Sequence, residues 1–243
     1  MSFVVVIPAR YQSTRLPGKP LIKIAGESMI LRTYKQCIKA VPKELVYIAT
    51  DDSRIQGECE AAGAQVIMTG VECLTGTDRV AQFSKTVQAD HYINVQGDEP
   101  LFHPEDLQSL VREIADFPND VICGYCAITR AEDFLSLSIP KVVMDQRKRL
   151  LYMSRAPIPA GKELVMKKGW RQVCAYGFPA AALEAFGSWT QKTELEQIED
   201  IEILRFIENG WSVKMLEMSN ESIAVDNPED IERVEEKLAK LRL

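Results

Sequence analysis

The chain has 243 residues, of which 46% are hydrophobic and 26% charged, and its formal net charge is −6. This balance is that of a globular protein and excludes collagen-like repeats and intrinsic disorder. The acidic net charge argues against nucleic-acid binding, because proteins that hold the phosphate backbone are usually basic. No segment approaches the roughly 20 apolar residues that span a bilayer, so we expect no membrane insertion. The six cysteines are irregularly spaced and predict no disulfide framework, which favours a cytoplasmic location.

The first half of the chain alternates short β-branched runs with amphipathic helical patterns. We expect strands at residues 3–8, 45–50, 64–69 and 91–96. We expect helices at residues 29–41, 53–62, 77–87 and 104–117. Alternation of this kind predicts a mainly parallel sheet with helices on both of its faces.

After Asp120 the strand-like runs follow one another more closely, at residues 121–128, 141–144, 150–153 and 173–178. Their connections are too short for crossover helices, so some of these strands should pair antiparallel. A helix at 194–209, a strand at 211–217 and a helix at 228–241 complete the pattern. We therefore expect one α/β domain over residues 1–243, with a β-rich segment at about 121–180.

A basic loop follows the first expected strand. It runs Pro8-Ala9-Arg10-Tyr11-Gln12-Ser13-Thr14-Arg15-Leu16-Pro17-Gly18-Lys19-Pro20 and carries three cations. Because parallel sheets place ligands at the carboxyl ends of their strands, Arg10, Arg15 and Lys19 could clamp a polyphosphate through charge-assisted hydrogen bonds. A solvated basic loop is the competing interpretation. The loop has neither the Walker form nor Gly-x-Gly-x-x-Gly, which argues against a P-loop hydrolase and a dinucleotide dehydrogenase.

Two carboxylates stand at the ends of other expected strands. In Asn94-Val95-Gln96-Gly97-Asp98-Glu99-Pro100 an apolar strand runs into a glycine and then into Asp98. A carboxylate there suits Mg²⁺, which takes one or two protein carboxylates and completes its shell with water and phosphate oxygens; an ordinary turn acid is the competing interpretation. In Val225-Asp226-Asn227-Pro228, capping of the last helix explains Asn227 and Pro228 but does not need Asp226. Asp226 could therefore complete a metal site with Asp98.

Several more polar clusters leave two interpretations open or favour a structural one. Thr75-Gly76-Thr77-Asp78-Arg79 could face an anion with its N–H groups and Arg79, or could be an ordinary Thr-capped helix with a surface arginine. Cys123 and Cys126 have redox spacing but sit in an apolar run, which favours buried structural cysteines. The acids between 194 and 202 alternate with apolar residues, so most of them should form the solvated face of a helix. The chain has two histidines, which favours a reaction driven by a metal and cations over His-based nucleophilic catalysis.

Taken together and in this order, these segments resemble the bacterial 3-deoxy-manno-octulosonate (Kdo) cytidylyltransferases. The resemblance covers nearly the whole chain and rests on Ile7-Pro8-Ala9-Arg10-Tyr11, Arg15-Leu16-Pro17-Gly18-Lys19-Pro20-Leu21, Ala49-Thr50-Asp51-Asp52, Thr75-Gly76-Thr77-Asp78-Arg79, Asn94-Val95-Gln96-Gly97-Asp98-Glu99-Pro100, Tyr152-Met153-Ser154-Arg155-Ala156-Pro157-Ile158-Pro159, Tyr176-Gly177-Phe178 and Val225-Asp226-Asn227-Pro228-Glu229-Asp230. It implies a three-layer α/β/α Rossmann-like nucleotidyltransferase fold with a small β-rich dimerisation segment, and hence a homodimer.

The resemblance also implies a reaction. CMP is transferred from CTP to the anomeric hydroxyl of a 3-deoxy-2-ulosonic acid, pyrophosphate is released, and the activated sugar serves lipopolysaccharide synthesis. Mg²⁺ is the implied cofactor, with Asp98 and Asp226 as its ligands. The implied nucleotide-binding residues are Ala9, Arg10, Arg15, Lys19, Thr75, Arg79 and Gln96, and the implied catalytic residues are Lys19, Arg15 and Asp98. The implied sugar-binding residues are Gln96, Arg155, Gln172, Tyr176, Glu196 and Gln197.

The chain departs from the family pattern mainly on the sugar side. It reads Glu72-Cys73-Leu74-Thr75 where the family usually has an acid and a histidine before Ser-Gly-Thr. It reads Arg171-Gln172-Val173-Cys174-Ala175-Tyr176 where many members have Arg/Lys-His-x-Gly-x-Tyr. A glutamine amide offers a fixed carbonyl acceptor, which the ammonium of a modified substrate could use. The 8-amino analogue of Kdo is therefore a second candidate substrate besides Kdo itself. The residues are also compatible with a related nucleotidyltransferase acting on another acidic sugar or a phosphorylated alcohol, and with an inactive nucleotide-binding regulator.

Overall fold

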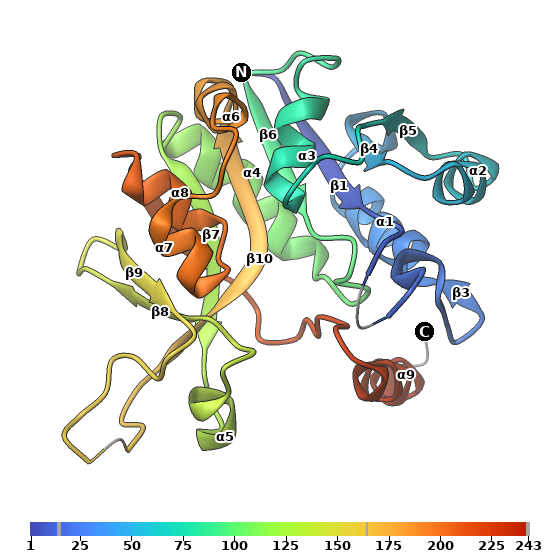
Figure 1. The fold of residues 1–243 in the computed structure, drawn as a ribbon. Coiled ribbons are helices and arrows are strands. Elements are labelled where there is room, and N and C mark those ends of the chain that lie inside the picture. Colours follow the sequence, from blue (N-terminus) through green and yellow to red (C-terminus); the bar gives the residue numbers. More distant parts are fainter. Residues whose placement is uncertain (14–15, 164, 242–243) are drawn as a thin grey trace.

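The computed structural model describes residues 1–13, 16–163 and 165–241 and has the α/β architecture that the sequence predicts (Figure 1). The main sheet has the order β11-β7-β10-β6-β1-β4-β5. Its strands are β1 (Phe3–Ala9), β4 (Val46–Thr50), β5 (Gln65–Met68), β6 (His91–Val95), β7 (Val121–Ala127), β10 (Trp170–Pro179) and β11 (Val213–Glu217). β1 pairs in parallel with β4 and β6, and β4 with β5, so the first half of the chain forms the predicted parallel sheet.

Helices cover both faces of this sheet, as strands that are apolar on both sides require. The helices are α1 (Met29–Ala40), α2 (Ser53–Ala61), α3 (Gly76–Phe83), α4 (Pro104–Asp116), α5 (Ala131–Leu135), α6 (Ala180–Ser188), α7 (Glu194–Glu199), α8 (Ile203–Glu208) and α9 (Pro228–Leu241). Buried residues of α1, α2 and α4 pack on one face, and those of α3, α6 and α8 pack on the other. The predicted three-layer α/β/α arrangement is therefore confirmed.

Strand β10 gives the second half of the chain its different character. It runs antiparallel to both of its neighbours, β6 and β7, whereas β7 and β11 are parallel. The hairpin of β8 (Lys141–Met144) and β9 (Leu150–Ser154) joins the sheet through β10 and projects from the layers at the left of Figure 1. The expectation that some strands after Asp120 pair antiparallel is confirmed.

The last helix, α9, lies beside the parallel half of the sheet, at the end of a long connection from β11 (Figure 1). It begins at Pro228, as predicted, and Asp230 Oδ2 accepts from the Asn227 N–H at 3.0 Å. α9 packs against the short hairpin of β2 (Lys23–Ile24) and β3 (Glu27–Ser28). The apolar cluster at this contact contains Leu16, Ile24, Met29, Leu101, Val225, Val234 and Leu238.

Several elements differ from their predicted form. The helix expected at 194–209 is two helices, α7 and α8, because Asp200 takes a left-handed conformation (φ 51°) that ends α7. The helix expected at 77–87 ends at Phe83. No pattern predicts the β2–β3 hairpin, α5 or α6; the α6 sequence is largely alanine and lacks a polar face, so its periodicity is weak.

The acids around α7 are not all solvated, which corrects the expectation of an exposed acidic face. Glu196 is fully buried and accepts from Arg205 Nε at 2.5 Å and from Nη2 at 2.6 Å. Arg205 is also fully buried, donates to Asp78 Oδ1 at 2.9 Å, and lies over the Phe186 ring. A buried charge needs such partners, because its desolvation is otherwise uncompensated. The network joins α7 and α8 to the first turn of α3.

Two further findings concern the helices and the cysteines. None of the helices in the described parts of the chain is long and apolar enough to cross a bilayer. All six cysteines are free thiols. Cys123 and Cys126 are both buried in the sheet, as their structural interpretation predicts.

Removing the buried cation should destabilise the protein strongly. We expect Arg205→Leu to lower the free energy of unfolding by about 3–5 kcal/mol, because Glu196 is then buried without its partner. This loss corresponds to a drop in Tm of about 10 °C. Adding Glu196→Leu to Arg205→Leu should recover part of the loss, because it removes the uncompensated charge.

The matched control is Lys192→Ala, which breaks the more exposed ion pair with Asp200. It should change the free energy of unfolding by less than about 1 kcal/mol. Urea unfolding followed by circular dichroism measures all three variants. Equal stability of Arg205→Leu and Lys192→Ala would contradict a structural role for the buried network.

Candidate active site

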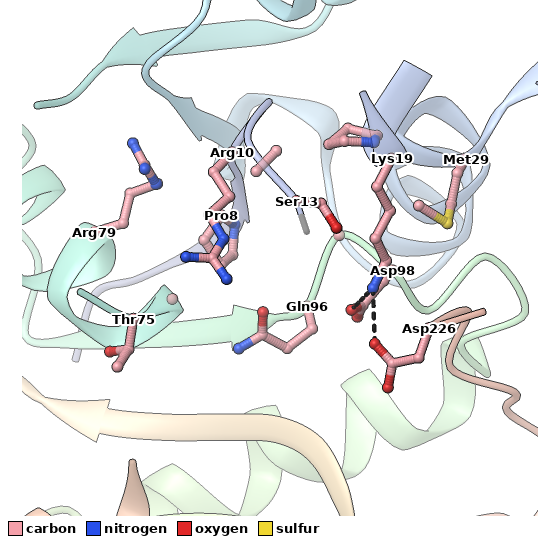
Figure 2. A pocket seen from close by; sticks show the side chains of 14 residues that line it. Pro8, Arg10, Ser13, Lys19, Met29, Thr75, Arg79, Gln96, Asp98 and Asp226 are labelled. Atoms are coloured by element: carbon pink, nitrogen blue, oxygen red, sulfur yellow. Dashed lines mark hydrogen bonds and ion pairs between the residues drawn. The ribbon is translucent and has the colours of Figure 1, made fainter. Parts of the chain in front are cut away.

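A cavity of about 290 Å³ opens where β1 and β6 end, at the edge of the sheet where parallel strands place their ligands (Figure 2). It is lined by the loops after these two strands, by the first turn of α3, and by one residue of the connection before α9. The lining residues are Pro8, Ala9, Arg10, Ser13, Lys19, Pro20, Met29, Thr75, Gly76, Arg79, Gln96, Gly97, Asp98 and Asp226. All the predicted nucleotide and metal residues that the structure describes therefore meet here, and Arg15 lies outside the described residues.

The loop after β1 folds back so that two of its cations reach the cavity. The Gly18 N–H donates to the Tyr11 carbonyl oxygen at 3.1 Å. Gly18 has a φ of 68°, in the region that favours glycine, and a short 3-10 turn, Lys19–Leu21, begins directly after it. Figure 2 shows Lys19 pointing toward Asp98, while Arg10 reaches into the same space on the side of Gln96.

The loop after β6 depends on the close approach of two backbones. A Cβ atom at Gly97 would lie 2.9 Å from the Pro8 carbonyl oxygen and 3.1 Å from a methyl carbon of Ile30. Glycine is therefore required at this point, where the chain leaves β6 beside the end of β1. The Thr33 hydroxyl donates to the Gly97 carbonyl oxygen at 3.2 Å and holds the turn in place.

Asp226 reaches the same edge through the connection between β11 and α9. The connection is tied to the acidic loop at two points. The Ser222 hydroxyl donates to the buried Glu99 carboxylate, and the Val225 N–H donates to the Asp98 carbonyl oxygen at 3.0 Å. Burial, and then the neighbouring charge of Asp98, raises the pKa of Glu99 to about 7. These contacts bring the Asp226 carboxylate opposite that of Asp98.

Lys19 lies between the two carboxylates. Its Nζ is 2.7 Å from Asp98 Oδ2 and 3.0 Å from Asp226 Oδ1 (Figure 2), and 14% of its side chain is exposed. Burial by itself would lower the pKa of Lys19, but the two negative charges outweigh burial and raise it. The ammonium is therefore charged at neutral pH, and two carboxylates converge on one cationic centre.

This arrangement fits a hard divalent cation. Asp98 and Asp226 direct oxygen ligands from two separate elements to one point, as Mg²⁺ requires when phosphates and water complete its shell. Within the described ranges, no group of three or more His, Cys, Asp or Glu side chains is arranged to hold a metal. The donor set therefore suits an ion that arrives with a phosphate ligand better than a structural ion bound by protein alone.

The first turn of α3 borders the cavity, and its Arg79 is buried instead of lying on the surface. Thr75 is the N-cap and forms a capping box with Asp78, so the predicted cap is confirmed. Arg79 is 2% exposed, and its guanidinium donates to Asp51 Oδ2 at 2.9 Å and to the Thr69 hydroxyl. Arg79 thus fixes the ends of β4 and β5 while it lines the cavity.

Two residues expected on the sugar side lie on β10, the strand next to β6. Tyr176 pairs with Asn94, and the Gln96 N–H donates to the Cys174 carbonyl oxygen at 3.4 Å. Gln172 Nε2 donates to the Tyr176 hydroxyl at 3.0 Å, and both side chains are more than nine-tenths buried. The pair is close to Gln96 along the sheet, although neither residue lines the cavity.

The remaining expected sugar-binding residues are engaged elsewhere. The Arg155 guanidinium donates to the carbonyl oxygens of Leu137, Ser138, Glu199 and Asp200. Glu196 is held in the interior by Arg205, and Gln197 is exposed and donates to the Lys192 carbonyl oxygen. Contrary to expectation, Glu196 and Gln197 therefore lie outside the cavity, and their side chains serve the fold around α7.

Sequence reasoning missed Glu202, the acid that does approach the site. Its carboxylate accepts from the Thr77 N–H at 3.0 Å and from Gln96 Nε2 at 3.3 Å. Burial raises the pKa of Glu202. The sequence pattern predicts one continuous helix over 194–209, and this prediction does not show that Glu202 approaches the site. The break at Asp200 changes which acids face the sheet, and no sequence pattern indicates that Asp200 takes the left-handed conformation.

Comparison with known proteins agrees with this geometry. The profile of the cytidylyltransferase family matches residues 4–223. The chain is 36% identical to the 3-deoxy-manno-octulosonate cytidylyltransferase of Syntrophotalea carbinolica, over 99% of this chain and 100% of that protein. It is 35% identical to the protein of the same name from Escherichia coli, over 98% of this chain and 96% of that protein. The corresponding protein of Cellvibrio japonicus is 39% identical, over 96% and 97%.

Solved structures give the same result. A CMP:2-keto-3-deoxy-manno-octonic acid synthetase complexed with CTP matches with a TM-score of 0.92 at 34% identity, covering 99% of this chain and 100% of that one. The inositol-1-phosphate CTP transferase of T. maritima matches with a TM-score of 0.70 at 14% identity, over 100% and 96%, which shows a shared fold alone. The chain therefore belongs to the cytidylyltransferase family and, within it, to the 3-deoxy-manno-octulosonate cytidylyltransferases.

Proposed function

We propose that this chain transfers CMP from CTP to the anomeric hydroxyl of 3-deoxy-manno-octulosonate or a close analogue and releases pyrophosphate. One observation carries the proposal. Cationic side chains and two convergent carboxylates meet at the ends of β1 and β6, in a chain that is similar along its whole length to cytidylyltransferases named for this sugar. The solved relative that holds CTP supports the same nucleotide.

The cations of the cavity suit a triphosphate. Arg10 is exposed at the mouth, and Lys19 reaches the two carboxylates, so both can form charge-assisted hydrogen bonds to phosphate oxygens. We assign Arg15 to the same group on its sequence position. The remaining nucleotide contacts are assigned to Ala9, Thr75, Arg79 and Gln96, which line the cavity.

In the reaction, the anomeric hydroxyl loses its proton to solvent as its oxygen forms a bond to the α-phosphorus, and the bond from this phosphorus to the pyrophosphate oxygen breaks. The negative charge that gathers on the phosphates is the main barrier, and cations fixed in advance relieve it. Lys19 is the cation best placed to compensate this negative charge, because its ammonium already lies at the acidic end of the cavity. Mg²⁺ held by Asp98 and Asp226 would supply further positive charge to the phosphates.

The sugar is assigned to the β10 side of the cavity, next to Gln96. There the Glu202 carboxylate can accept hydrogen bonds from sugar hydroxyls, and Gln96 can donate or accept them. Gln172 lies next to this region on β10 and donates a hydrogen bond to the Tyr176 hydroxyl. Arg155 remains assigned to the sugar, because a third of its side chain is exposed even though backbone carbonyls hold it.

The activity has a direct test. Pyrophosphate release should require CTP, Kdo and Mg²⁺ together, should stop in EDTA, and should return with Mg²⁺ more fully than with Ca²⁺. Asp98→Asn should lower turnover by about 10²–10³, the usual effect of removing one preorganised charge. Glu105→Gln, which alters an exposed acid paired with His103, is the matched control and should leave turnover unchanged.

Each competing function gives a different result in the same assay. Pyrophosphate release with a phosphorylated alcohol but not with Kdo would indicate the related nucleotidyltransferase. CTP binding without pyrophosphate release from any acceptor would indicate the inactive regulator. Full turnover in EDTA would show that the reaction does not need a metal ion bound by Asp98 and Asp226.

We also propose that Gln172 helps to select the sugar. Its carbonyl is an acceptor at any pH, whereas a histidine at this position can become a charged donor, and the ammonium of 8-amino-Kdo requires an acceptor. Gln172→His should therefore lower the ratio of kcat/KM for 8-amino-Kdo over Kdo by more than about tenfold. Glu202→Gln should lower kcat/KM for both sugars together and leave KM for CTP unchanged. An equal ratio in the parent and in Gln172→His would mean that this position does not set specificity.

We propose further that the chain forms a homodimer through its β-rich segment. Large apolar side chains are concentrated on the surface of this region and of α7 beside it. Among the described residues, five of the nine exposed ones fall here: Leu135, Leu137, Leu151, Val165 and Ile198. Exposed apolar groups in one region are typical of a surface that another protein covers, and the homodimer that the family resemblance implies favours a second copy of this chain as that partner.

A single charge on the projecting hairpin should disrupt this dimer. Leu151 lies on β9 and is 58% exposed, so Leu151→Lys would place an ammonium in the proposed interface. Sedimentation velocity should give a dimer for the parent and a monomer for Leu151→Lys. Val71→Lys changes an equally apolar, 81% exposed side chain outside the segment and should leave the dimer intact. A parent chain that sediments as a monomer would refute the assembly.

A further inference from the structure

The strongest unexplained feature of the cavity is the position of the Lys19 ammonium. It contacts Asp98 Oδ2 at 2.7 Å and Asp226 Oδ1 at 3.0 Å, at the point on which both carboxylates converge. This is also the point where a divalent ion would take the same two oxygens. Figure 2 shows the lysine side chain extended from the β1 loop directly to this point.

An ammonium and a divalent cation cannot share this point. Two positive centres within the reach of one pair of carboxylates repel each other, and each loses the partner that compensates its partial burial. For the ion to bind, the ammonium must move to another anion. Lysine can make this movement, because its charge is carried on a flexible four-carbon chain, whereas an arginine fork is more rigid.

The cavity provides a place for the displaced ammonium only when a phosphate is present. From Lys19 the cavity continues past Ser13 to Arg10, which is the part that we assign to the triphosphate. In the chain without nucleotide this part has the Arg10 cation at its mouth, which does not attract the ammonium. A triphosphate reverses the sign of the charge there.

We propose that Lys19 holds the place of the divalent ion between Asp98 and Asp226 until the nucleotide arrives, so that the ion and the triphosphate bind in one coupled step. The inference rests on the proposed function, because it takes the metal and the triphosphate from it. By linkage, the coupling is reciprocal: the ion strengthens triphosphate binding by the same factor by which the triphosphate strengthens binding of the ion.

The proposal predicts an unusual effect of removing the charge of Lys19. In Lys19→Met two carboxylates face each other without the ammonium, and a divalent ion can enter without displacing anything. The variant should therefore bind the ion better than the parent does, although it loses a phosphate contact and hence activity. A purely phosphate-binding lysine would leave metal affinity without nucleotide unchanged.

The test measures Mn²⁺ binding in the absence of nucleotide, by the loss of the free-ion electron paramagnetic resonance signal. We expect Lys19→Met to bind Mn²⁺ at least about tenfold more tightly than the parent. Adding Asp98→Asn to Lys19→Met should abolish this gain. Lys19→Arg, which keeps the positive charge, and Lys23→Met, which removes a half-exposed lysine paired with Glu58, should behave as the parent.

A second measurement follows stability instead of the metal signal. Mg²⁺ without nucleotide should raise the Tm of Lys19→Met and leave that of the parent nearly unchanged, because a ligand of the folded state stabilises it more, at a given concentration, the more tightly it binds. This readout also confirms that the variant is folded before its metal affinity is interpreted.

Water-proton relaxation of the parent with Mn²⁺ and CTP separates failure of this inference from failure of the proposed function. A ternary complex that Asp98→Asn lacks supports the proposed metal site. If that complex forms and Lys19→Met binds Mn²⁺ alone no better than the parent, the place-holding role is overturned and the proposed function stands. If Asp98→Asn leaves the ternary complex intact, the metal site is wrong, and the inference falls with it.

Discussion

The parallel pairing of β1 with β6 is the constraint on which the site depends. The register from Phe3 opposite His91 to Val6 opposite Asn94 brings the two strand ends side by side. The basic loop and the acidic loop therefore leave the sheet at one point, and Lys19 contacts Asp98 across 79 positions of sequence. Gly97 permits this closeness, because a larger residue would meet the backbone of β1. Without this pairing, the charges of the two loops would remain unrelated surface features.

A second, buried group of charges supports the opposite side of the cavity. Arg205 joins Glu196 of α7 to Asp78 of α3, and Asp78 is also the acid of the capping box at Thr75. One fully buried guanidinium therefore fixes both the turn that lines the cavity and the helices that carry Glu202. The acidic end of the cavity is held by loops at the ends of strands, whereas the side that we assign to the sugar is held by an ion network between helices.

The common location of the residues that we assign to the nucleotide could be predicted from the sequence, because these residues lie next to strong local signals. Arg10 directly follows β1, Lys19 lies farther along the same loop, and Asp98 lies in the loop after β6. The alternation of strands and helices implies that these strand ends meet. Asp226 is recognisable because helix capping does not account for it. The identity of the metal, the roles of individual side chains and the oligomer remain proposals, since they depend on ligands and contacts beyond one chain.

The side of the cavity that we assign to the sugar could not be predicted in the same way. Glu196 and Glu202 are both acids of one amphipathic stretch, and the expectation of a mostly solvated acidic face does not distinguish them. The left-handed turn at Asp200 separates them, and its cause is tertiary: the Arg155 guanidinium binds the carbonyl oxygens of Glu199 and Asp200. Such a contact joins segments that no local pattern relates. Glu196 therefore lies in the core, and Glu202 approaches the site.

The late position of Asp226 has a consequence for how the protein matures during synthesis. Chains are made from the N-terminus, and their early parts can fold before the later parts exist. β1 and β6 can pair, and Lys19 can meet Asp98, while the second carboxylate, 207 positions after Lys19, is still to be made. A growing chain with this half-built site has a basic loop and one acid in place of two. The charge balance of the proposed site is then established only when the connection that carries Asp226 closes over it, so the site is assembled only after synthesis has passed residue 226.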